Sequence, residues 1–464
     1  MAGNNSIPYR LLKNINPMAQ NNLHTEAKKV LKQSLKNILS NCKVSKGLIS
    51  FDEKNDKEID KYINEAEKHK KTWLGYRELY GILYRQVSHY LNEHIKERRW
   101  ETSDDLKNII TDKGIENVSD RIIAYLESIP RKYSIYFELP SVKGIGVKEV
   151  NLTDNISLIE KVDESDFPEI KIPGFGLGGR GLLGSYRNYS LNKGQLYVHI
   201  QTQGYADGTL ESTAVKKAYS KFKQFILLAK TKGLLVERER GIATLGDFYG
   251  YTTKEDSPIY VVYDKEPDTE KYPITLPKIV SEYISKMRIN EDILKPDEYE
   301  LIVEKFEDKN ALTPNDKAKI LKDRLQYPIK LLKTTDTDAD AEPIKTAIEW
   351  AFDSLTNDNE TVAFIQACIG LEAILGDEEE EPQKSLQNKF ADRCAYLLGK
   401  NFSERKNIKE SFVKLYNIRS KLNHGRKAKL DREQLHFLRF SQSILNRIIW
   451  KEISYIEDIG TTTS

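Results

Sequence analysis

Cysteine, methionine and tryptophan are scarce in this 464-residue sequence, which contains three, three and four of them. The three cysteines, Cys42, Cys368 and Cys394, are too few for a disulfide framework, and no two of them have CxxC spacing. Zinc ribbons and dithiol redox centres are therefore excluded, and a reducing compartment is favoured. We accordingly expect a cytoplasmic protein.

Long apolar runs are also missing. The longest mostly apolar stretch, Val362 to Leu375, is interrupted by Gln366 and Glu372. It falls short of the ~20 residues that a helix needs to cross a bilayer. The first residues, MAGNNSIPYR, lack the apolar core of a secretory signal. We therefore expect no membrane role.

An excess of one charge is absent from the whole chain but present in two neighbouring segments. Lys and Arg number 72 against 70 Asp and Glu, which argues against a uniformly basic nucleic-acid coat. Asp336 to Glu381, however, carries a net charge of −13, and Lys384 to Arg432 carries +10. Either the helices of the two segments lie side by side and neutralise each other, or the basic segment faces a polyanion.

The chain is long enough for two or three domains, because a single core stops growing near 250–300 residues. Periodicity predicts a multidomain α+β protein with a mainly helical region over 1–132, an α+β domain over 133–300 and a helical domain over 301–464. Strands are predicted at 133–139, 146–152, 156–160, 195–202 and 259–263. Helices are predicted within 57–100, 104–111, 118–129, 213–231, 314–333, 343–356, 360–375, 384–398, 404–424 and 431–456.

Two patterns that resemble known sites are weak. The glycine-rich stretch from Pro173 to Gly184 does not pass from a strand into a helix, so we interpret it as a loop and not as a phosphate cradle. His89 and His94 are five residues apart, which places them on different sides of a helix. The histidines and cysteines form no cluster at metal-ligand spacing. We expect no metal and no cofactor, although carboxylate ligands alone remain an open alternative.

The most informative stretch is NIKESFVKLYNIRSKLNHGRK, from Asn407 to Lys427. An apolar stripe at alternating spacings of four and three residues includes position 419, which is arginine. The stripe consists of Ile408, Phe412, Leu415, Arg419 and Leu422. A guanidinium on such a stripe must be paired, or must lie in a cleft that holds an anion.

His424 lies five residues after Arg419 and is followed by Gly425, a residue that commonly ends a helix. The negative end of a helix favours the protonated imidazole. An arginine and a titratable histidine beside a basic segment are the minimum equipment for RNA cleavage. The ribose 2′-hydroxyl is the nucleophile, the histidine moves a proton, and the arginine stabilises charge on the phosphate.

Two further charged residues interrupt apolar stripes in the same region. Glu372 follows Ile365 and Ile369, and Arg393 follows Leu386 and Phe390, at spacings of seven and three. We expect Glu372 and Arg393 to form a core ion pair that fixes the helix register. The alternative is that one or both of them support a catalytic cleft.

Three segments together resemble the HEPN (higher eukaryote and prokaryote nucleotide-binding) ribonucleases, and among these the Apea-like group of bacterial phage defence. They are GLEAILG from Gly370, FADRCAYLLG from Phe390, and RSKLNHG from Arg419, which contains the Arg-x4-His motif. The resemblance covers about residues 340–455. It implies an all-helical bundle that forms a homodimer, brings two Arg-His pairs into one cleft, and cleaves single-stranded RNA without metal.

By this resemblance Arg419 and His424 occupy the two catalytic positions. Active members of the family commonly have Asn, Asp or His after the arginine, and this sequence has Ser420. We expect Asn423 to contact phosphate or to cap the helix end. Supporting or RNA-binding roles are predicted for Ser420, Lys421, Asn423, Arg426, Lys427, Glu372 and Arg393.

The sequence thus predicts an endoribonuclease for anti-phage defence or abortive infection, with regions before about residue 300 that sense a phage-derived trigger and restrain the nuclease. The alternatives are a non-catalytic HEPN module that binds RNA or protein, in a defence or toxin-antitoxin system, and a pure scaffold.

Overall fold

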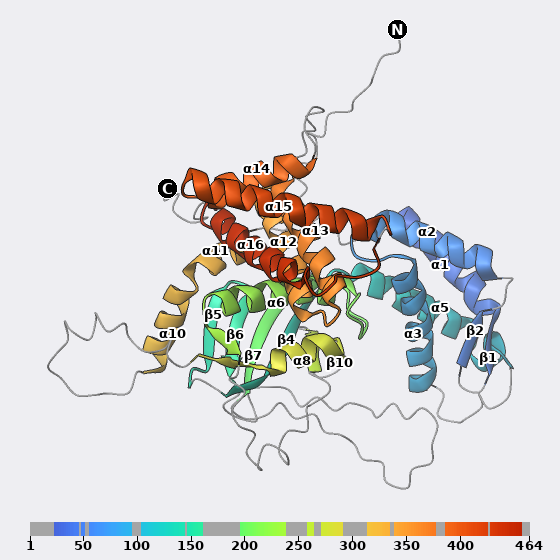
Figure 1. The fold of residues 1–464 in the computed structure, drawn as a ribbon. Coiled ribbons are helices and arrows are strands. Elements are labelled where there is room, and N and C mark those ends of the chain that lie inside the picture. The colour runs from blue at the N-terminus through green and yellow to red at the C-terminus, as the bar shows by residue number, and fades with distance from the viewer. Residues whose placement is uncertain are drawn as a thin grey trace, which may run out of the picture. The chain divides into compact units, whose positions relative to one another are not determined.

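The protein was analysed as a computed structural model, drawn in Figure 1. The structure describes residues 23–45, 48–51, 55–94, 104–143, 146–160, 195–237, 258–263, 271–290, 313–334, 338–376, 386–425 and 427–456. The chain divides into two compact units: Met1–Tyr133 with Gln203–Val215, and Ser134–Thr202 with Lys216–Ser464. Helices and antiparallel strands occur together, so the prediction of a multidomain α+β chain is confirmed in its general form.

The first unit is built from amphipathic helices around one apolar core. Its elements are α1 (Thr25–Ser40), β1 (Cys42–Ser45), β2 (Leu48–Phe51), α2 (Asp56–Lys70), α3 (Tyr76–His94), β3 (Asp104–Asp105), α4 (Leu106–Ile109) and α5 (Asp112–Glu127). Leu31, Leu35 and Ile38 recur at helical spacing along α1 and are fully buried. The three strands form a small sheet in the order β2-β1-β3.

The second unit contains a six-stranded sheet in the order β10-β9-β4-β7-β6-β5. The strands are β4 (Arg131–Lys143), β5 (Glu149–Thr153), β6 (Ile156–Glu160), β7 (Gln195–Gly204), β9 (Pro258–Tyr263) and β10 (Lys271–Thr275). β6 pairs antiparallel with β5 and β7, and β9 pairs antiparallel with β10. Alternate residues of β4 from Tyr133 to Leu139 are buried on one face, as the period of a strand requires.

Helix α6 (Thr213–Thr231) lies between this sheet and the C-terminal helices. The ring of Phe222 stacks on Phe137 of β4, with centroids 4.3 Å apart. Lys223, the next residue, donates hydrogen bonds of 2.9 and 3.2 Å to the Asp353 carboxylate of α12 (Ala341–Thr356). Successive side chains of α6 thus contact opposite layers. The short elements β8 (Leu235–Glu237), α8 (Lys278–Ser285) and β11 (Met287–Ile289) follow in sequence.

Five helices near the end of the chain pack on one another (Figure 1). They are α12, α13 (Glu360–Leu375), α14 (Leu386–Leu398), α15 (Phe402–Asn423) and α16 (Leu435–Ile453). Phe352, Phe364, Phe412 and Ile448 on these helices are fully buried. Gly370 allows α13 to approach α16 closely, because a Cβ at this position would lie 2.7 Å from a methyl carbon of Leu445.

The predicted helices at 213–231 and 360–375 are confirmed to the residue, and the predicted single helix at 314–333 is wrong. It is divided at Leu325 into α10 (Pro314–Arg324) and α11 (Gln326–Lys333). Pro328 explains the break, since its ring clashes with the carbonyl four residues earlier and it has no N–H to donate. Thr313 and Asp316 form the expected capping box of α10.

The prediction of helix throughout 104–111 is also wrong at its start. Residues Asp104 and Asp105 form β3, because Asp105 pairs with Lys43 of β1, and only one helical turn follows. The glycine-rich stretch at 173–184 lies outside the described residues. None of the described helices is both long and apolar enough to span a membrane.

Candidate functional site

Helix α15 carries Arg419 and has two unlike halves. It starts at a side-chain cap, in which Asn401 accepts a hydrogen bond from the Glu404 amide at 2.9 Å. Over 402–411 its side chains are largely exposed. Its second half buries Phe412, Leu415, Tyr416, Ile418 and Leu422. Phe412, Leu415 and Leu422 of the expected apolar stripe are therefore buried as predicted, whereas Ile408 is only half-buried.

Arg419 lies on that stripe and forms an ion pair with Glu372 of α13. Its Nη2 donates to Glu372 Oε2 at 2.7 Å, and each side chain is 24% exposed. Burial raises the pKa of Glu372, and Arg419 opposes that shift without cancelling it. A guanidinium on an apolar stripe was expected either to be paired or to lie in a cleft that holds an anion. The ion pair with Glu372 meets the first of these two conditions.

Tyr416 completes the surroundings of this ion pair. The Arg419 guanidinium carbon lies 5.8 Å from the centroid of the Tyr416 ring. Burial first, and then the charge of Glu372, raises the pKa of the tyrosine hydroxyl. Tyr416 stacks on Phe412 with centroids 5.1 Å apart, which fixes its ring. The ring and the carboxylate together hold the arginine in place.

Most donors of Arg419 are not used by Glu372. A guanidinium has five N–H donors, and the bond to Glu372 occupies one of them. The Nε atom is buried and has no hydrogen-bond partner among the described residues. Because Nε is buried, an acceptor from solvent would use the N–H donors of the two Nη atoms, and Glu372 occupies one of these four.

His424 caps the carboxyl end of α15 and is exposed to solvent. Its backbone amide donates to the Ser420 carbonyl at 3.0 Å. Gly425 has a φ of 67°, the left-handed conformation typical of the residue after a helix. Five residues around a helix correspond to about 140°, so His424 and Arg419 point in different directions within one chain.

The other predicted site residues differ in their surroundings. Ser420, Lys421 and Asn423 are exposed on the last turn of α15. The Lys427 ammonium donates to Asp431 Oδ2 and to Gln434 Oε1, both at 2.5 Å, and so closes the connection to α16. Arg426 lies outside the described residues.

The predicted ion pair between Glu372 and Arg393 is wrong. Glu372 is bonded to Arg419, whereas Arg393 Nη1 donates to the Leu375 carbonyl at 3.0 Å and to the Gly376 carbonyl at 3.4 Å. Carbonyls at the end of α13 have no partners within the helix, and Arg393 satisfies two of them. The alternative, that Glu372 supports the candidate site, matches the observed contact.

Sequence reasoning missed Tyr416. Its signal was present, because a residue three positions before Arg419 shares its side of the helix. It was overlooked because a tyrosine at helical spacing is ordinarily interpreted as core.

A second histidine, His199 of β7, lies in very different surroundings. Its ring stacks on Tyr136 with centroids 4.6 Å apart and an interplanar angle of 14°. Burial lowers its pKa to about 4. Neither ring nitrogen has a hydrogen-bond partner among the described residues. His199 is therefore neutral near pH 7.

Comparison with known proteins gives no relative for this chain: no protein-family model, curated protein or solved structure matches it. Within the part of the chain that the structure describes, no group of three or more His, Cys, Asp or Glu side chains is arranged to hold a metal ion.

Proposed function

We propose that this chain is a metal-independent endoribonuclease of the HEPN type, with Arg419 and His424 as its catalytic residues. One observation carries the proposal: Arg419 is held by Glu372 with donors to spare, five residues before an exposed histidine at the end of the same helix. The reaction itself is inferred from the similarity of the Arg-x4-His segment to HEPN ribonucleases.

In the proposed reaction a ribose 2′-oxygen attacks the neighbouring phosphorus. His424 acts as the base that takes the proton of the 2′-hydroxyl and then as the acid that supplies a proton to the departing 5′-oxygen. Arg419 donates hydrogen bonds to the phosphorane oxygens as negative charge develops on them. The new bond joins O2′ to phosphorus, the bond from phosphorus to O5′ breaks, and the products end in a 2′,3′-cyclic phosphate and a 5′-hydroxyl.

The proposal includes a homodimer and a cytoplasmic location. Because Arg419 and His424 diverge by about 140° on one helix, a second copy would supply the complementary residue of each pair. In this scheme the chain acts in anti-phage defence or abortive infection, and the regions before about residue 300 hold the nuclease inactive until a phage-derived trigger binds.

Incubation with single-stranded RNA in EDTA tests the activity. We expect the wild-type chain to cleave, His424→Ala to lose about 10²- to 10⁴-fold in rate, and Arg419→Ala to lose about 10²- to 10³-fold. Lys414→Ala is the matched control, because it removes one exposed cation from the same helix. Equal cleavage by all four proteins would refute the assignment.

The second candidate is a non-catalytic module that binds RNA or protein. The ion pair between Arg419 and Glu372 favours it, since a guanidinium with an internal partner also has a purely structural use. On this alternative RNA affinity persists in His424→Ala with a strong salt dependence, and no turnover is seen in any variant.

A further inference from the structure

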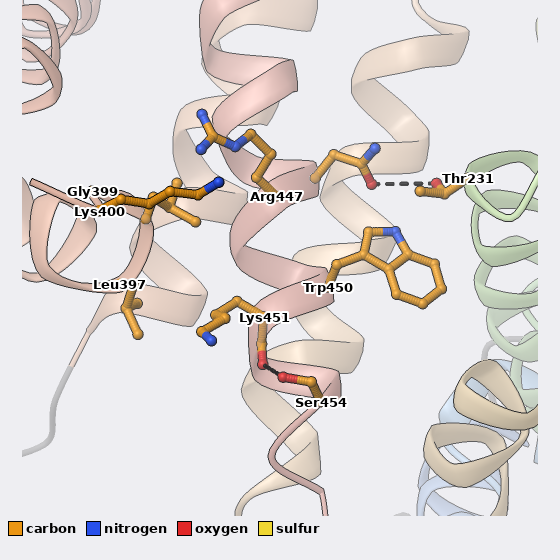
Figure 2. A pocket seen from close by; sticks show the side chains of 10 residues that line it. Thr231, Leu397, Gly399, Lys400, Arg447, Trp450, Lys451 and Ser454 are labelled. Atoms are coloured by element: carbon orange, nitrogen blue, oxygen red, sulfur yellow. Dashed lines mark hydrogen bonds between the residues drawn. The ribbon is translucent and has the colours of Figure 1, made fainter. Parts of the chain in front are cut away.

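A basic cleft lies away from Arg419 and His424, where the ends of three helices meet (Figure 2). Its volume is about 570 Å³. The end of α14 contributes Leu397, Leu398, Gly399 and Lys400, the last turns of α16 contribute Asn446, Arg447, Trp450, Lys451 and Ser454, and α6 contributes Thr231. We call this hollow the α16 cleft.

The α16 cleft has one sign of charge. Lys400, Arg447 and Lys451 line it, and none of its lining residues is acidic. All three cations are exposed, and none forms a salt bridge with a described residue. Figure 2 shows Arg447 and Lys451 on one side of α16, facing the end of α14 that carries Lys400.

Two acidic side chains lie close in sequence to the cleft cations. Glu404 accepts a hydrogen bond from the backbone amide of Lys400 at 2.8 Å, as part of the cap of α15. Glu452, which follows Lys451 in the sequence, lines a different hollow together with Arg393. Neither carboxylate forms a salt bridge with a cation of the α16 cleft among the described residues, although Glu452 and Lys451 attract each other electrostatically.

Capping of helix ends does not account for Lys400. Cations often lie near the carboxyl end of a helix, where they interact with unpaired carbonyls. At the end of α14 this role belongs to another residue, because Arg405 Nε donates to the Gly399 carbonyl at 3.0 Å. The ammonium group of Lys400 remains available for an anion.

An aromatic ring, Trp450, lines the side of the cleft near Thr231 (Figure 2). Trp450 is half-buried, and the Lys232 ammonium lies 4.5 Å from the centroid of its ring. Asn446 adds an amide, which bonds to Thr231 at 3.3 Å, and Ser454 adds a hydroxyl. Cations beside an indole and neutral polar groups are the combination with which proteins hold single-stranded nucleic acid.

We propose that the α16 cleft binds phosphate groups of single-stranded RNA, as a second contact site distinct from the catalytic pair. The inference rests on the proposed function, since RNA is taken as the substrate. Lys400 lies just before α15 and His424 just after it, so the 22-residue helix places the two sites about 33 Å apart. Arg447 and Lys451 are about 6 Å apart along α16 and offer successive contacts to one strand.

The test measures binding of a fluorescein-labelled oligouridylate by the full chain carrying His424→Ala, which prevents turnover. The cleft variant adds Lys400→Gln, Arg447→Gln and Lys451→Gln. The control adds Lys286→Gln, Arg288→Gln and Lys319→Gln, which remove three exposed cations from other elements of the same unit. Thermal melting of both variants checks that they fold alike.

We expect the cleft variant to bind at least about tenfold more weakly than the control at moderate salt. Each phosphate that is no longer neutralised makes the plot of log affinity against log salt shallower by about 0.7, so removal of three cations makes it shallower by about 2. Equal affinity and equal slope in the two variants overturn the inference. Competition by uridine monophosphate at the concentration that an oligouridylate requires would identify a free-nucleotide site and overturn the RNA assignment.

The outcome separates this inference from the proposed activity. If the cleft variant binds more weakly and the wild-type chain does not cleave RNA, the proposed RNA-binding role of the α16 cleft is supported and the proposed nuclease activity is refuted. If cleavage depends on His424 and the cleft variant binds RNA as the control does, the nuclease activity is supported and the RNA-binding role of the α16 cleft is refuted.

Discussion

His199 and His424 belong to the same compact unit, but their surroundings are opposite. His199 projects from strand β7, stacks on Tyr136 and is only 9% exposed, and burial lowers its pKa to about 4. His424 lies exposed at the end of α15, where helix carbonyls point outward. The difference teaches that surroundings decide which histidine can exchange protons with solvent, because the imidazole ring is the same in both places.

The largest expected effect is a difference in RNA-cleavage rate between variants of these two histidines. His424→Ala should reduce RNA cleavage by about 10²- to 10⁴-fold without lowering the melting temperature, because the side chain is exposed. His199→Phe should leave the cleavage rate within about twofold, since the ring is buried and belongs to β7, whereas Arg419 and His424 belong to α15 and its cap. Single-turnover rates and melting curves of both variants check the contrast. A larger loss of activity in His199→Phe than in His424→Ala would reverse it.

The second effect is the response of stability to acid. His199 has a pKa of about 4 in the folded chain against 6.5 in the unfolded chain, so the unfolded state binds more protons between these values. Its contribution to stability is present above pH 6.5 and is lost as the pH falls toward 4, by about 2–3 kcal/mol.

Substitution of His199 by Phe keeps a flat ring against Tyr136 and removes the titration. The free energy of unfolding of His199→Phe should fall less than that of the wild-type chain between pH 6.5 and 4, as denaturant titrations can measure. Identical pH profiles would show that His199 is not sealed from solvent.

The smallest effect compares two ion pairs of α15. Arg419→Ala leaves the half-buried Glu372 carboxylate without its cation and should cost about 1–2 kcal/mol of unfolding free energy. Addition of Glu372→Gln should recover much of that loss. Lys409 lies 2.6 Å from Asp392 in an exposed pair, and Lys409→Ala should change stability by less than about 0.5 kcal/mol. Equal costs for Arg419→Ala and Lys409→Ala would show that burial makes no difference here.

The sequence was sufficient to predict helices whose ends and buried faces are set by their own residues. The helices at Thr213–Thr231 and Glu360–Leu375 have clear ends and apolar periodicity, and both were predicted to the residue. Positions 412, 415 and 422 were predicted to face the core and do so. The break at Leu325 was also predictable, because Pro328 is visible in the sequence.

Contacts between different helices could not be predicted from the spacing of residues within one helix. Glu372, Arg393 and Arg419 lie on three helices, and spacing alone cannot tell which arginine faces the carboxylate. The choice depends on how α13, α14 and α15 pack together and on the rotation of each helix about its own axis. The α16 cleft was missed for the same reason, since its residues come from three separate elements.

The left-handed backbone at Gly425 has a stereochemical consequence. With a φ of 67°, this position strains an L-amino acid even though no described atom outside its chain neighbours lies within 4 Å of where a Cβ would stand. A mirror-image residue adopts the same backbone angle without strain. A chain assembled by ligation with D-alanine at 425 should therefore keep the imidazole of His424 in its position. A chain with L-alanine at 425 should displace that imidazole.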